Sequence, residues 1–243
     1  VIRGNWKMQL ENSVDGYHVS TVHRVFASTV RNREERDSLK GLKQTEGGRL
    51  VGTVPSGAYD LGNGHMSIWA QHTTPERRPI YKKKPWLESN LSAAKVEWIL
   101  KKGRNLALFP NVMLMDNPST QIRYVKPVSV NRAEVTVYCI APVGEGTEAR
   151  AARLRKFEDF YLTAGMATSD DMAALEDTMA GSQAMQARWN DFNRGLKTMT
   201  IGPDEGAKAV GFDPVSSSES WENETLFFGF YRRWRKMMSN IPD

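Results

Sequence analysis

Residues 12–23, NSVDGYHVSTVH, decide how this chain folds and what it binds. The segment holds Asp15, His18 and His23, although the whole chain of 243 residues has only four histidines. Imidazole nitrogens and carboxylate oxygens are ligands with which proteins hold iron and similar divalent metals. Two such rings and a nearby carboxylate in one short segment therefore predict a metal site.

The spacing of the two histidines constrains the local fold. Residues of a regular α-helix advance by about 100° each, which would place His18 and His23 about 140° apart around the axis. Both rings reach one ion only if the helix bends or unwinds between them. Asp15, three residues before His18, shares its helical face and is placed to hydrogen-bond the second nitrogen of that ring. Two interfacial histidines without a metal are the alternative that the spacing leaves open.

The third ligand comes from a part of the chain that spacing does not identify. Two imidazoles and one carboxylate bind iron on one side and leave its other positions open to dioxygen and substrate. The aspartates of the sequence TSDD, residues 168–171, also suit a helix N-terminus, where Thr168 or Ser169 would be the cap. That role does not exclude metal binding. The carboxylates that qualify are Glu158, Asp159, Asp170, Asp171, Glu176 and Asp191.

The composition indicates a globular protein with a sizeable core, since 40% of the residues are hydrophobic. Cys139 is the only cysteine, which excludes an internal disulfide and a cysteine-ligated zinc or iron–sulfur centre within these residues. The net charge of +5 comes from basic residues in mixed-sign runs, so we expect a solvated surface and no nucleic-acid partner. No run approaches the roughly 18 apolar residues of a membrane span, and the first residues do not show the charged, apolar and small-residue pattern of a signal peptide. A cytoplasmic protein without membrane contacts is expected.

The patterns around the histidine segment predict an α+β fold with a β-rich middle and helices at both ends. Alternating apolar residues and turn residues indicate antiparallel strands, and apolar residues at three- and four-residue steps indicate amphipathic helices. The expected strands cover residues 4–7 (a strand end), 51–54, 65–71, 106–115, 121–127 and 134–141. The expected helices cover residues 8–30, 91–102, 148–162, 171–189 and 226–238, with exposed loops at 32–49 and 74–85.

A longer stretch, residues 5–23 with the sequence NWKMQLENSVDGYHVSTVH, resembles the iron motif of Rieske non-haem iron oxygenase large subunits, the aromatic-ring-hydroxylating dioxygenases. In that family Asn-Trp-Lys is followed by Glu-Asn and then by Asp-x-Tyr-His-x4-His. The resemblance continues through RNLALFPNVMLMD, QIRYVKPVSVNRAEVTVYCIAP, RLRKFEDFYLTAGMATSDD, WNDFNRG and GPDE, and covers most of the chain. Family members that act on benzoate are the most similar, followed by those that act on anthranilate.

The resemblance implies a set of iron ligands. It assigns His18, His23 and Asp171 to a mononuclear Fe(II), with Asp170 as the second choice for the carboxylate. Asp15 would be the catalytic aspartate that links the iron site to the Rieske centre of an adjacent subunit. Residues 12–23 would then supply two ligands and the link to the electron donor.

The resemblance also implies a pocket for an aromatic substrate, lined by Asn105, Met115, Tyr161 and Ala167. A buried substrate carboxylate needs a cation or several hydrogen bonds. Arg104 and Arg123, which lie beside apolar strand residues, are the candidates for that cation. An arginine at a strand end is more often a surface residue, which is the alternative for both.

The catalytic domain of the family has a curved antiparallel sheet gripped around helices, similar to START-type lipid-transfer domains. The resemblance implies this helix-grip fold for a single domain of residues 1–243. The family's N-terminal Rieske domain, which carries a [2Fe-2S] cluster, has no counterpart in these residues. The chain also begins without methionine, at what we expect to be a strand. We therefore expect the catalytic domain by itself.

The activity that the resemblance implies is that of an NADH-dependent dioxygenase of aromatic catabolism. Electrons from NADH would pass through a reductase or ferredoxin and the Rieske cluster of a neighbouring alpha subunit. Both atoms of O2 would be added to an aromatic carboxylate such as benzoate, giving a cis-dihydrodiol. Family members form trimers, with or without a small beta subunit. The alternatives are a related oxygenase for anthranilate, a halobenzoate or salicylate, and a START-like carrier of an apolar ligand that needs no metal.

Overall fold

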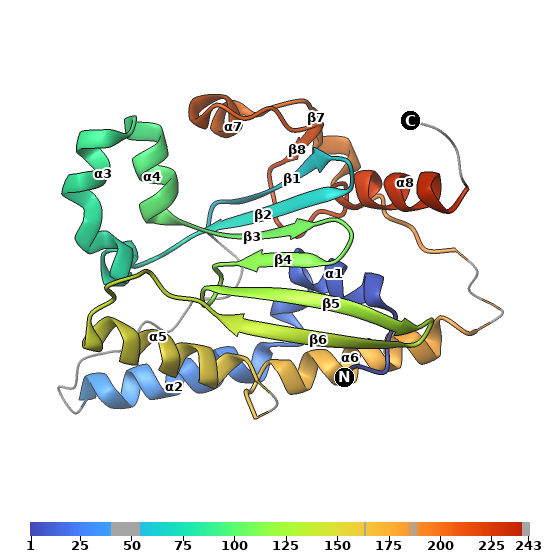
Figure 1. Cartoon of the computed structure of the whole chain (residues 1–243), viewed down its shortest axis with the longest axis horizontal. Helices are drawn as coiled ribbons and strands as arrows, with labels where there is room; N and C mark the ends of the chain where they lie inside the picture. The colour runs from blue at the N-terminus through green and yellow to red at the C-terminus, as the bar shows by residue number, and fades with distance from the viewer. Residues whose placement is uncertain (40–53, 163, 185, 187–188, 240–243) are drawn as a thin grey trace.

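One antiparallel sheet of eight strands organises the computed structural model, which describes residues 1–39, 54–162, 164–184, 186 and 189–239 (Figure 1). The strands are ordered β6-β5-β4-β3-β2-β1-β8-β7, so that β1 to β6 pair with their neighbours in the chain and the last two strands extend the β1 edge. Their bounds are β1 Ser56–Gly62, β2 His65–Gln71, β3 Lys102–Leu108, β4 Val112–Met115, β5 Gln121–Ser129, β6 Arg132–Cys139, β7 Thr200–Ile201 and β8 Ser216–Ser218.

The strands in the middle of the sheet bury one face. β2 and β3 alternate between buried and partly exposed residues, which is the pattern of strands with one face in a core. Met66, Ile68 and Ala107 point into that core. The β1–β2 turn uses residues 62–64, Gly-Asn-Gly, all with positive φ values. Glycine and asparagine adopt this backbone conformation most readily, so the turn sets the register of the hairpin.

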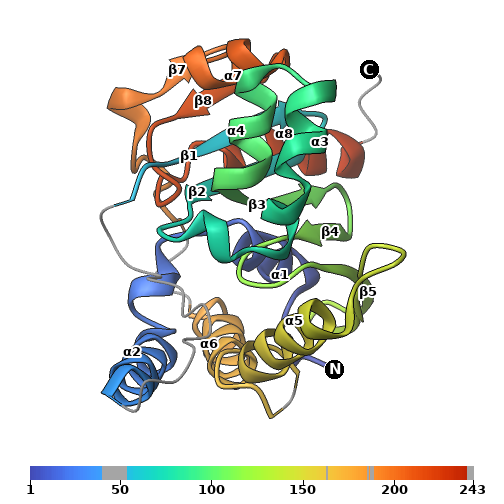
Figure 2. The same ribbon diagram turned by 90° about the vertical axis from the view of Figure 1, so that its left-hand side faces the viewer.

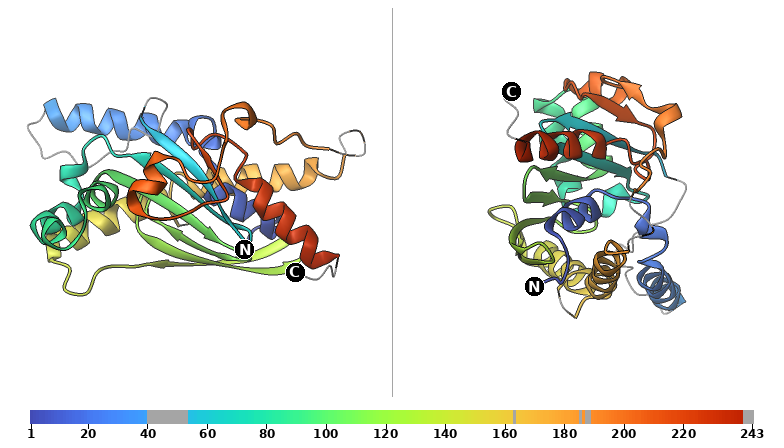
Figure 3. Two further views of the ribbon diagram at one scale, coloured as in Figure 1. Left: turned by 90° about the horizontal axis from the view of Figure 1, so that it is seen from above. Right: turned by 90° about the vertical axis from the view of Figure 1, so that its right-hand side faces the viewer.

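Helices pack on both faces of the sheet. α1 (Trp6–Ser13) packs on β3, β4 and β5, and α8 (Phe227–Met238) packs on β1 and β2. α4 (Ala93–Lys101) packs on β3 from the other face. In the view from above, α1, α2 and α6 lie on one side of the curved sheet (Figure 3). The remaining α-helices are α2 Arg24–Leu39, α3 Lys84–Asn90, α5 Thr147–Phe160, α6 Thr168–Gly181 and α7 Glu205–Val210.

The main hydrophobic core lies between the inner face of the sheet and helices α1, α5 and α8. Burying such side chains stabilises the folded state by roughly 25 cal/mol for each Å² of apolar surface removed from water. Figure 2 shows α2, α5 and α6 gathered below the sheet, on the side away from α7. The buried core members include Leu10, Val14, Met66, Ile68, Ala107, Met113, Val125, Phe157, Phe160, Leu226, Phe227 and Phe230.

The C-terminal helix is fixed by a buried carboxylate. Asp60 of β1 is 3% exposed, and the backbone N–H groups of Gly62 and Gly229 donate to it. A Cβ atom at position 229 would lie 2.3 Å from the Asp60 carboxylate oxygens, so only glycine fits there. The amphipathic helix predicted at residues 226–238 is present as α8, and its residues Phe227 and Phe230 are buried.

The predicted α+β class, with a curved antiparallel sheet and flanking helices, is confirmed. The single helix predicted at residues 8–30 is wrong, because α1 ends at Ser13 and a 3-10 turn, His18–Ser20, separates it from α2. The strand end predicted at residues 4–7 is also wrong. The Asn5 side chain accepts a hydrogen bond from the backbone of Lys7 and caps a helix instead.

Two predicted loops contain helix. α2 continues to Leu39, so the loop predicted at residues 32–49 is wrong in its first part, and residues 40–49 lie outside the described residues. The predicted loop at residues 74–85 holds two 3-10 helices, Pro75–Arg77 and Pro79–Lys83, and the start of α3. Proline at the first position of each short helix explains their starts.

The remaining differences concern short or polar elements. Residues 51–53 of the strand predicted at 51–54 lie outside the described residues, and Val54 is in a bend. The strand predicted at residues 106–115 is a hairpin, since a turn at Pro110 separates β3 from β4. The helix predicted at residues 171–189 runs from Thr168 to Gly181. Strands β1, β7 and β8 and helix α7 were not predicted, because their sequences are rich in glycine and serine or very short.

Among the described residues, none of the helices combines the length and apolar character needed to cross a bilayer.

Candidate metal centre

Three side chains from separate elements bring one ligand atom each to a common point. His18 lies in the 3-10 turn, His23 immediately precedes α2, and Asp171 lies in the first turn of α6. The Nε2 atoms of the two histidines are 3.2 Å apart. Asp171 Oδ1 lies 3.7 Å from Nε2 of His18 and 3.3 Å from Nε2 of His23. Within the described ranges, no other group of three or more histidine, cysteine, aspartate or glutamate side chains meets in this way.

The three atoms fit one metal ion. Two donors that are each about 2.1 Å from an ion and at right angles to each other lie about 3 Å apart. The three separations between the donor atoms are close to that value. Two neutral nitrogens and one carboxylate oxygen on one side of an ion are the donor set of non-haem ferrous sites. Asp170, Glu158, Asp159, Glu176 and Asp191, which the sequence left open as ligands, do not belong to the group.

A turn built around Asp15 interrupts the helix between α1 and α2. Its carboxylate accepts hydrogen bonds from the backbone N–H groups of Tyr17 and His18, at 2.9 and 3.1 Å. The backbone N–H of Gly16 donates to the carbonyl of Trp221. A Cβ atom at position 16 would lie 2.6 Å from the Trp221 ring, so the turn requires glycine. This local unwinding turns both histidines towards one point, as their spacing required.

Asp15 also determines which nitrogen of His18 is available. Its Oδ2 lies 2.9 Å from Nδ1 of His18, and a carboxylate only accepts, so Nδ1 carries the proton and Nε2 keeps its lone pair. Burial lowers the pKa of His18, but the hydrogen bond and charge of Asp15 outweigh it and raise the pKa above the usual 6.5. Burial likewise raises the pKa of Asp15, and its contacts with His18 hold that pKa below the usual value.

His23 is more deeply buried than His18. It is 2% exposed, and its ring packs against the ring of Phe160 with centroids 5.1 Å apart. Burial lowers the pKa of His23, against the opposing effect of the Asp171 charge, so its neutral form is favoured. Its Nδ1 atom has no hydrogen-bond partner among the residues that the structure describes. The neutral imidazole is the form that binds a metal.

A pair of amides on α1 orients the carboxylate ligand. Asn12 Nδ2 donates to Asp171 Oδ1 at 3.1 Å and lies 3.4 Å from Nε2 of His18. Gln9 Nε2 donates to Asn12 Oδ1 at 3.2 Å, which fixes the direction of the Asn12 amide. Gln9 and Asn12 are three residues apart on one helix face. Sequence reasoning missed Gln9, although its spacing from Asn12 was a usable signal.

Five of the six predicted pocket residues lie together on the inner side of the sheet. Asn105 and Met115 face each other across β3 and β4, and Asn105 Nδ2 donates to the carbonyl of Ser13 at the end of α1. Tyr161, just after α5, donates from its hydroxyl to the carbonyl of Asn117 at 2.9 Å. The buried members of this group are Asn105, Met115, Arg123, Tyr161 and Ala167.

Arg104 is the predicted pocket residue that the structure places elsewhere. It precedes Asn105 in β3, and successive strand residues face opposite sides of a sheet. Its guanidinium lies 5.9 Å from the ring centroid of Trp98, on α4. Arg104 therefore belongs to the other face of the sheet, away from the histidine pair. Arg123 has its guanidinium 4.8 Å from the ring centroid of Tyr161, on the inner face.

Glu11, the residue before Asn12, has a raised pKa. Its carboxylate is hydrogen-bonded by the Tyr231 hydroxyl of α8. Burial, followed by repulsion from Asp15, raises the pKa of Glu11 from 4.5 to about 7, although Lys7 opposes the shift. A raised carboxyl pKa means that the folded state holds this proton more tightly than the unfolded state.

We predict that this group makes the protein less stable as the pH rises from about 4.5 to about 7. Glu11→Gln keeps a side chain that accepts from Tyr231 but does not titrate. Relative to that variant, the wild-type free energy of unfolding should fall by on the order of 3 kcal/mol over this interval. Urea unfolding of both proteins at pH 5 and pH 8 measures the difference. Parallel pH dependences of the two proteins would contradict the assignment.

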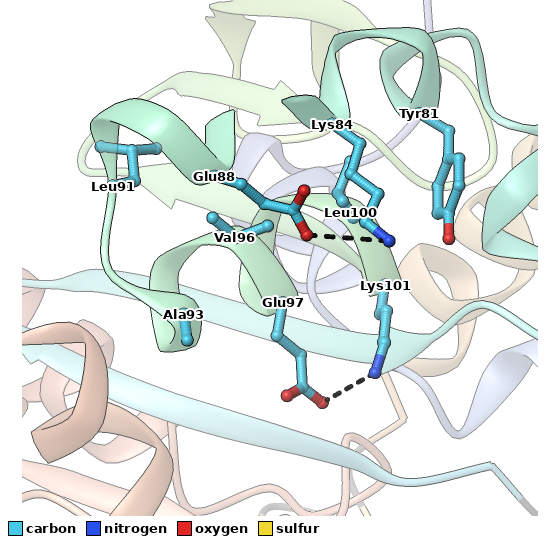
Figure 4. A pocket seen from close by; sticks show the side chains of 9 residues that line it. All are labelled: Tyr81, Lys84, Glu88, Leu91, Ala93, Val96, Glu97, Leu100 and Lys101. Carbon is cyan, nitrogen blue, oxygen red and sulfur yellow. Dashed lines mark ion pairs between the residues drawn. The ribbon is translucent and has the colours of Figure 1, made fainter. Parts of the chain in front are cut away.

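A surface pocket between α3 and α4 lies apart from these groups (Figure 4). Leu91, Val96 and Leu100 give it an apolar floor. Its rim carries the exposed ion pairs Lys84–Glu88 and Lys101–Glu97, with N–O distances of 3.7 and 3.5 Å. Exposed pairs of this kind contribute little to stability. The pocket shares no residue with the metal group or with the predicted substrate residues.

Two histidines and one carboxylate that meet at one point are the donor set of mononuclear non-haem iron sites. Comparison with known proteins defines the class more closely. Residues 1–240 match the family described as ring hydroxylating alpha subunit (catalytic domain). The chain belongs to this family, and the resemblance that the sequence suggested is confirmed.

Curated relatives cover nearly the whole chain. The chain is 41% identical over 241 residues to toluate 1,2-dioxygenase subunit alpha from Pseudomonas putida, covering 98% of this chain and 52% of the relative. It is 37% identical over 237 residues to the large subunit of 2-halobenzoate 1,2-dioxygenase from Burkholderia cepacia, covering 97% and 50%. The chain therefore spans about half the length of these relatives.

Solved structures support the fold. Naphthalene 1,2-dioxygenase with indole bound in the active site superposes with a TM-score of 0.74 at 21% identity, covering 98% of this chain and 53% of that chain. Naphthalene 1,2-dioxygenase from Rhodococcus sp. gives a TM-score of 0.72 at 17% identity, covering 99% and 55%. At these identities the likeness concerns the fold alone, and it supports the predicted helix-grip architecture.

Proposed function

We propose that residues 1–243 form the catalytic domain of a dioxygenase that adds both atoms of O2 to the ring of an aromatic carboxylate, giving a cis-dihydrodiol. The observation that carries this proposal is the convergence of His18, His23 and Asp171 within a chain of the ring-hydroxylating family. The donor atoms lie 3.2–3.7 Å apart, which suits one ferrous ion. A START-like carrier of an apolar ligand has no use for such a group.

His18, His23 and Asp171 would hold the iron, and the ion supplies dioxygen activation when bound. The protein's own groups have separate tasks. Asp15 holds the Nδ1 proton of His18, and Asn12 holds the Asp171 carboxylate in place. The surrounding core, with Phe160 against His23, excludes water from the reacting groups.

The electrons come from outside these residues under this proposal. NADH would reduce a reductase or ferredoxin, which would reduce the [2Fe-2S] Rieske cluster of a neighbouring alpha subunit. Asp15 is the residue we assign to the contact with that Rieske domain, since its side chain is 23% exposed while it is hydrogen-bonded to His18. The assembly would be a cytoplasmic trimer of alpha subunits, with or without a small beta subunit.

The proposed substrate is a benzoate-like acid. The relatives are named for toluate, 2-halobenzoate and anthranilate, which are all aromatic rings with a carboxylate. Asn105, Met115, Tyr161 and Ala167 would contact the ring, and a small residue at position 167 leaves room for it. Anthranilate, a halobenzoate or salicylate is the alternative substrate.

The test uses the oxygenase that contains this chain together with a Rieske domain and an NADH-driven reductase. We expect benzoate to be converted to a cis-dihydrodiol with consumption of one O2 for each product. Parallel reactions with anthranilate, 2-chlorobenzoate and salicylate rank the substrates by kcat/KM. Iron-loaded protein that binds these acids but oxidises none of them, with the reductase active, would contradict the proposal and favour the carrier.

A further inference from the structure

Three buried polar side chains stand in a row beside the predicted substrate residues. Ser119, Gln121 and Arg123 are 4%, 0% and 6% exposed. Gln121 and Arg123 are alternate residues at the start of β5, so they face the same side of the sheet, and Ser119 lies two residues before that strand. Gln121 is paired with Met115 and Arg123 with Met113, and both methionines belong to the core. Gln121 and Arg123 therefore face inward, and the buried Ser119 lies just before them in the chain.

The row holds more hydrogen-bond donors than the described residues satisfy. Arg123 Nε donates to Gln121 Oε1 at 3.1 Å, which occupies the oxygen of the amide. Ser119 Oγ is buried without a partner in the described part of the chain, and buried Gln121 Nε2 makes no well-formed hydrogen bond there, although the amide interacts with the Tyr161 hydroxyl. Arg123 likewise forms no ion pair with a carboxylate among the described residues. A buried guanidinium and buried donors without acceptors cost free energy unless a ligand supplies the acceptors.

The row lies close to the metal group. The ring of His23 packs on Phe160, the ring of Phe160 packs on Tyr161, and the guanidinium of Arg123 lies over Tyr161. The respective separations are 5.1, 4.6 and 4.8 Å. Two aromatic side chains thus connect the iron ligand to the unsatisfied donors. A substrate with a ring near the iron and an anionic group at one end matches this arrangement.

We propose that Ser119, Gln121 and Arg123 form the subsite that binds the carboxylate of the aromatic substrate. A carboxylate is an acceptor with about four lone-pair positions, and the three side chains can donate to it from guanidinium N–H groups, an amide NH2 and a hydroxyl. Gln121 has two tasks, because its oxygen holds Arg123 and its nitrogen donates to the ligand. This inference rests on the proposed function, from which it takes the aromatic acid.

The most informative variant is Gln121→Glu. The new carboxylate would lie beside Arg123 and supply the acceptor that the wild-type subsite lacks, so the variant should fold at least as stably as the wild type. The same carboxylate would repel an anionic ligand. Using the chain loaded anaerobically with Fe(II), we expect the Kd for benzoate, measured by isothermal titration calorimetry, to rise at least about tenfold, which is about 1.4 kcal/mol.

A second variant and a neutral ligand keep the test specific. Gln121→Leu removes the donor without adding charge, and should also raise the Kd for benzoate. Benzamide has the shape of benzoate without its charge, so the ratio of the benzamide Kd to the benzoate Kd should fall in both variants. Tyr124→Phe, which removes a hydroxyl from the opposite face of β5, should keep the wild-type ratio.

The subsite is overturned if both Gln121 variants bind benzoate as the wild type does, or if benzoate and benzamide weaken equally. Iron content, measured in the same samples, separates this result from a failure of the proposed function. Stoichiometric iron with unchanged benzoate binding removes the subsite and leaves the dioxygenase proposal in place. Acid-selective binding that needs Gln121 in a chain that holds no iron supports the subsite and contradicts the dioxygenase.

Discussion

Asp171→Ala is expected to lower the affinity of the folded chain for Fe(II) by at least about a hundredfold. Asp171 supplies the one anionic donor of the metal group, and its Oδ1 lies 3.3 Å from Nε2 of His23. Two neutral imidazoles without a carboxylate hold a ferrous ion much more weakly. Anaerobic equilibrium dialysis with iron quantification measures the affinity, and circular dichroism verifies that the variant is folded.

Two other aspartates of α6 serve as comparisons. Asp177→Ala changes an exposed carboxylate of the same helix and should bind iron like the wild type. Asp170→Ala tests the second choice for the ligand and should also retain iron. A loss of iron in Asp170→Ala but not in Asp171→Ala would transfer the ligand role to the neighbouring residue.

Asp15→Asn is expected to reduce NADH-driven dihydrodiol formation by at least about a hundredfold in the oxygenase that contains this chain and a Rieske domain. The wild-type carboxylate accepts the Nδ1 proton of His18 at 2.9 Å and remains partly exposed to a partner. An amide lacks the charge and can present the wrong group to the ring. Iron affinity should fall by about 10–100-fold, so the assay is run with excess Fe(II).

Hydrogen peroxide separates electron delivery from the iron site in this variant. A reaction driven by peroxide in place of NADH does not need electrons from the Rieske domain. The rate of this reaction in Asp15→Asn should therefore fall much less than the rate of the NADH-driven reaction. An equal fall in both reactions would mean that Asp15 acts only by holding His18. The KM for benzoate should stay within about twofold of the wild-type value, because Asp15 touches none of the predicted substrate residues.

Local patterns were sufficient for the elements with strong periodicity. The alternation of residues 65–71 predicted β2, and the apolar steps of residues 226–238 predicted α8. β1 and β8 were missed because SGAYDLG and SSS have no such pattern, and their hydrogen bonds depend on neighbouring strands. Gly57 in β1 illustrates the tertiary cause, since a Cβ atom there would lie 2.5 Å from the Trp69 ring nitrogen.

The metal group could be predicted only in part from the residues. The spacing of His18 and His23 required an unwound segment, and the turn around Asp15 provides it. Asp171 could not be chosen over other carboxylates without the family resemblance, because distance along the chain carries no information about contact between α6 and the segment that holds His18 and His23.

Strand alternation could not be applied to the substrate residues from the sequence, because the predicted strand began at residue 106, after both Arg104 and Asn105, whereas β3 begins at Lys102. Arg104 and Asn105 are consecutive in one strand and cannot both face the pocket, which favours Arg123. The same alternation places Gln121 beside Arg123, with Ser119 just before the strand, but the unsatisfied donors of Gln121 and Ser119 become visible only when the surrounding residues are known.

The central claim is that one iron ion binds between His18, His23 and Asp171. A crystal structure of the chain loaded anaerobically with Fe(II), with data collected at the iron absorption edge, tests it most directly. We expect one anomalous peak within about 2.3 Å of Nε2 of His18, Nε2 of His23 and an oxygen of Asp171, with at least two positions free of protein ligands. An iron peak held by other residues, or no peak in protein saturated with Fe(II), would contradict the account.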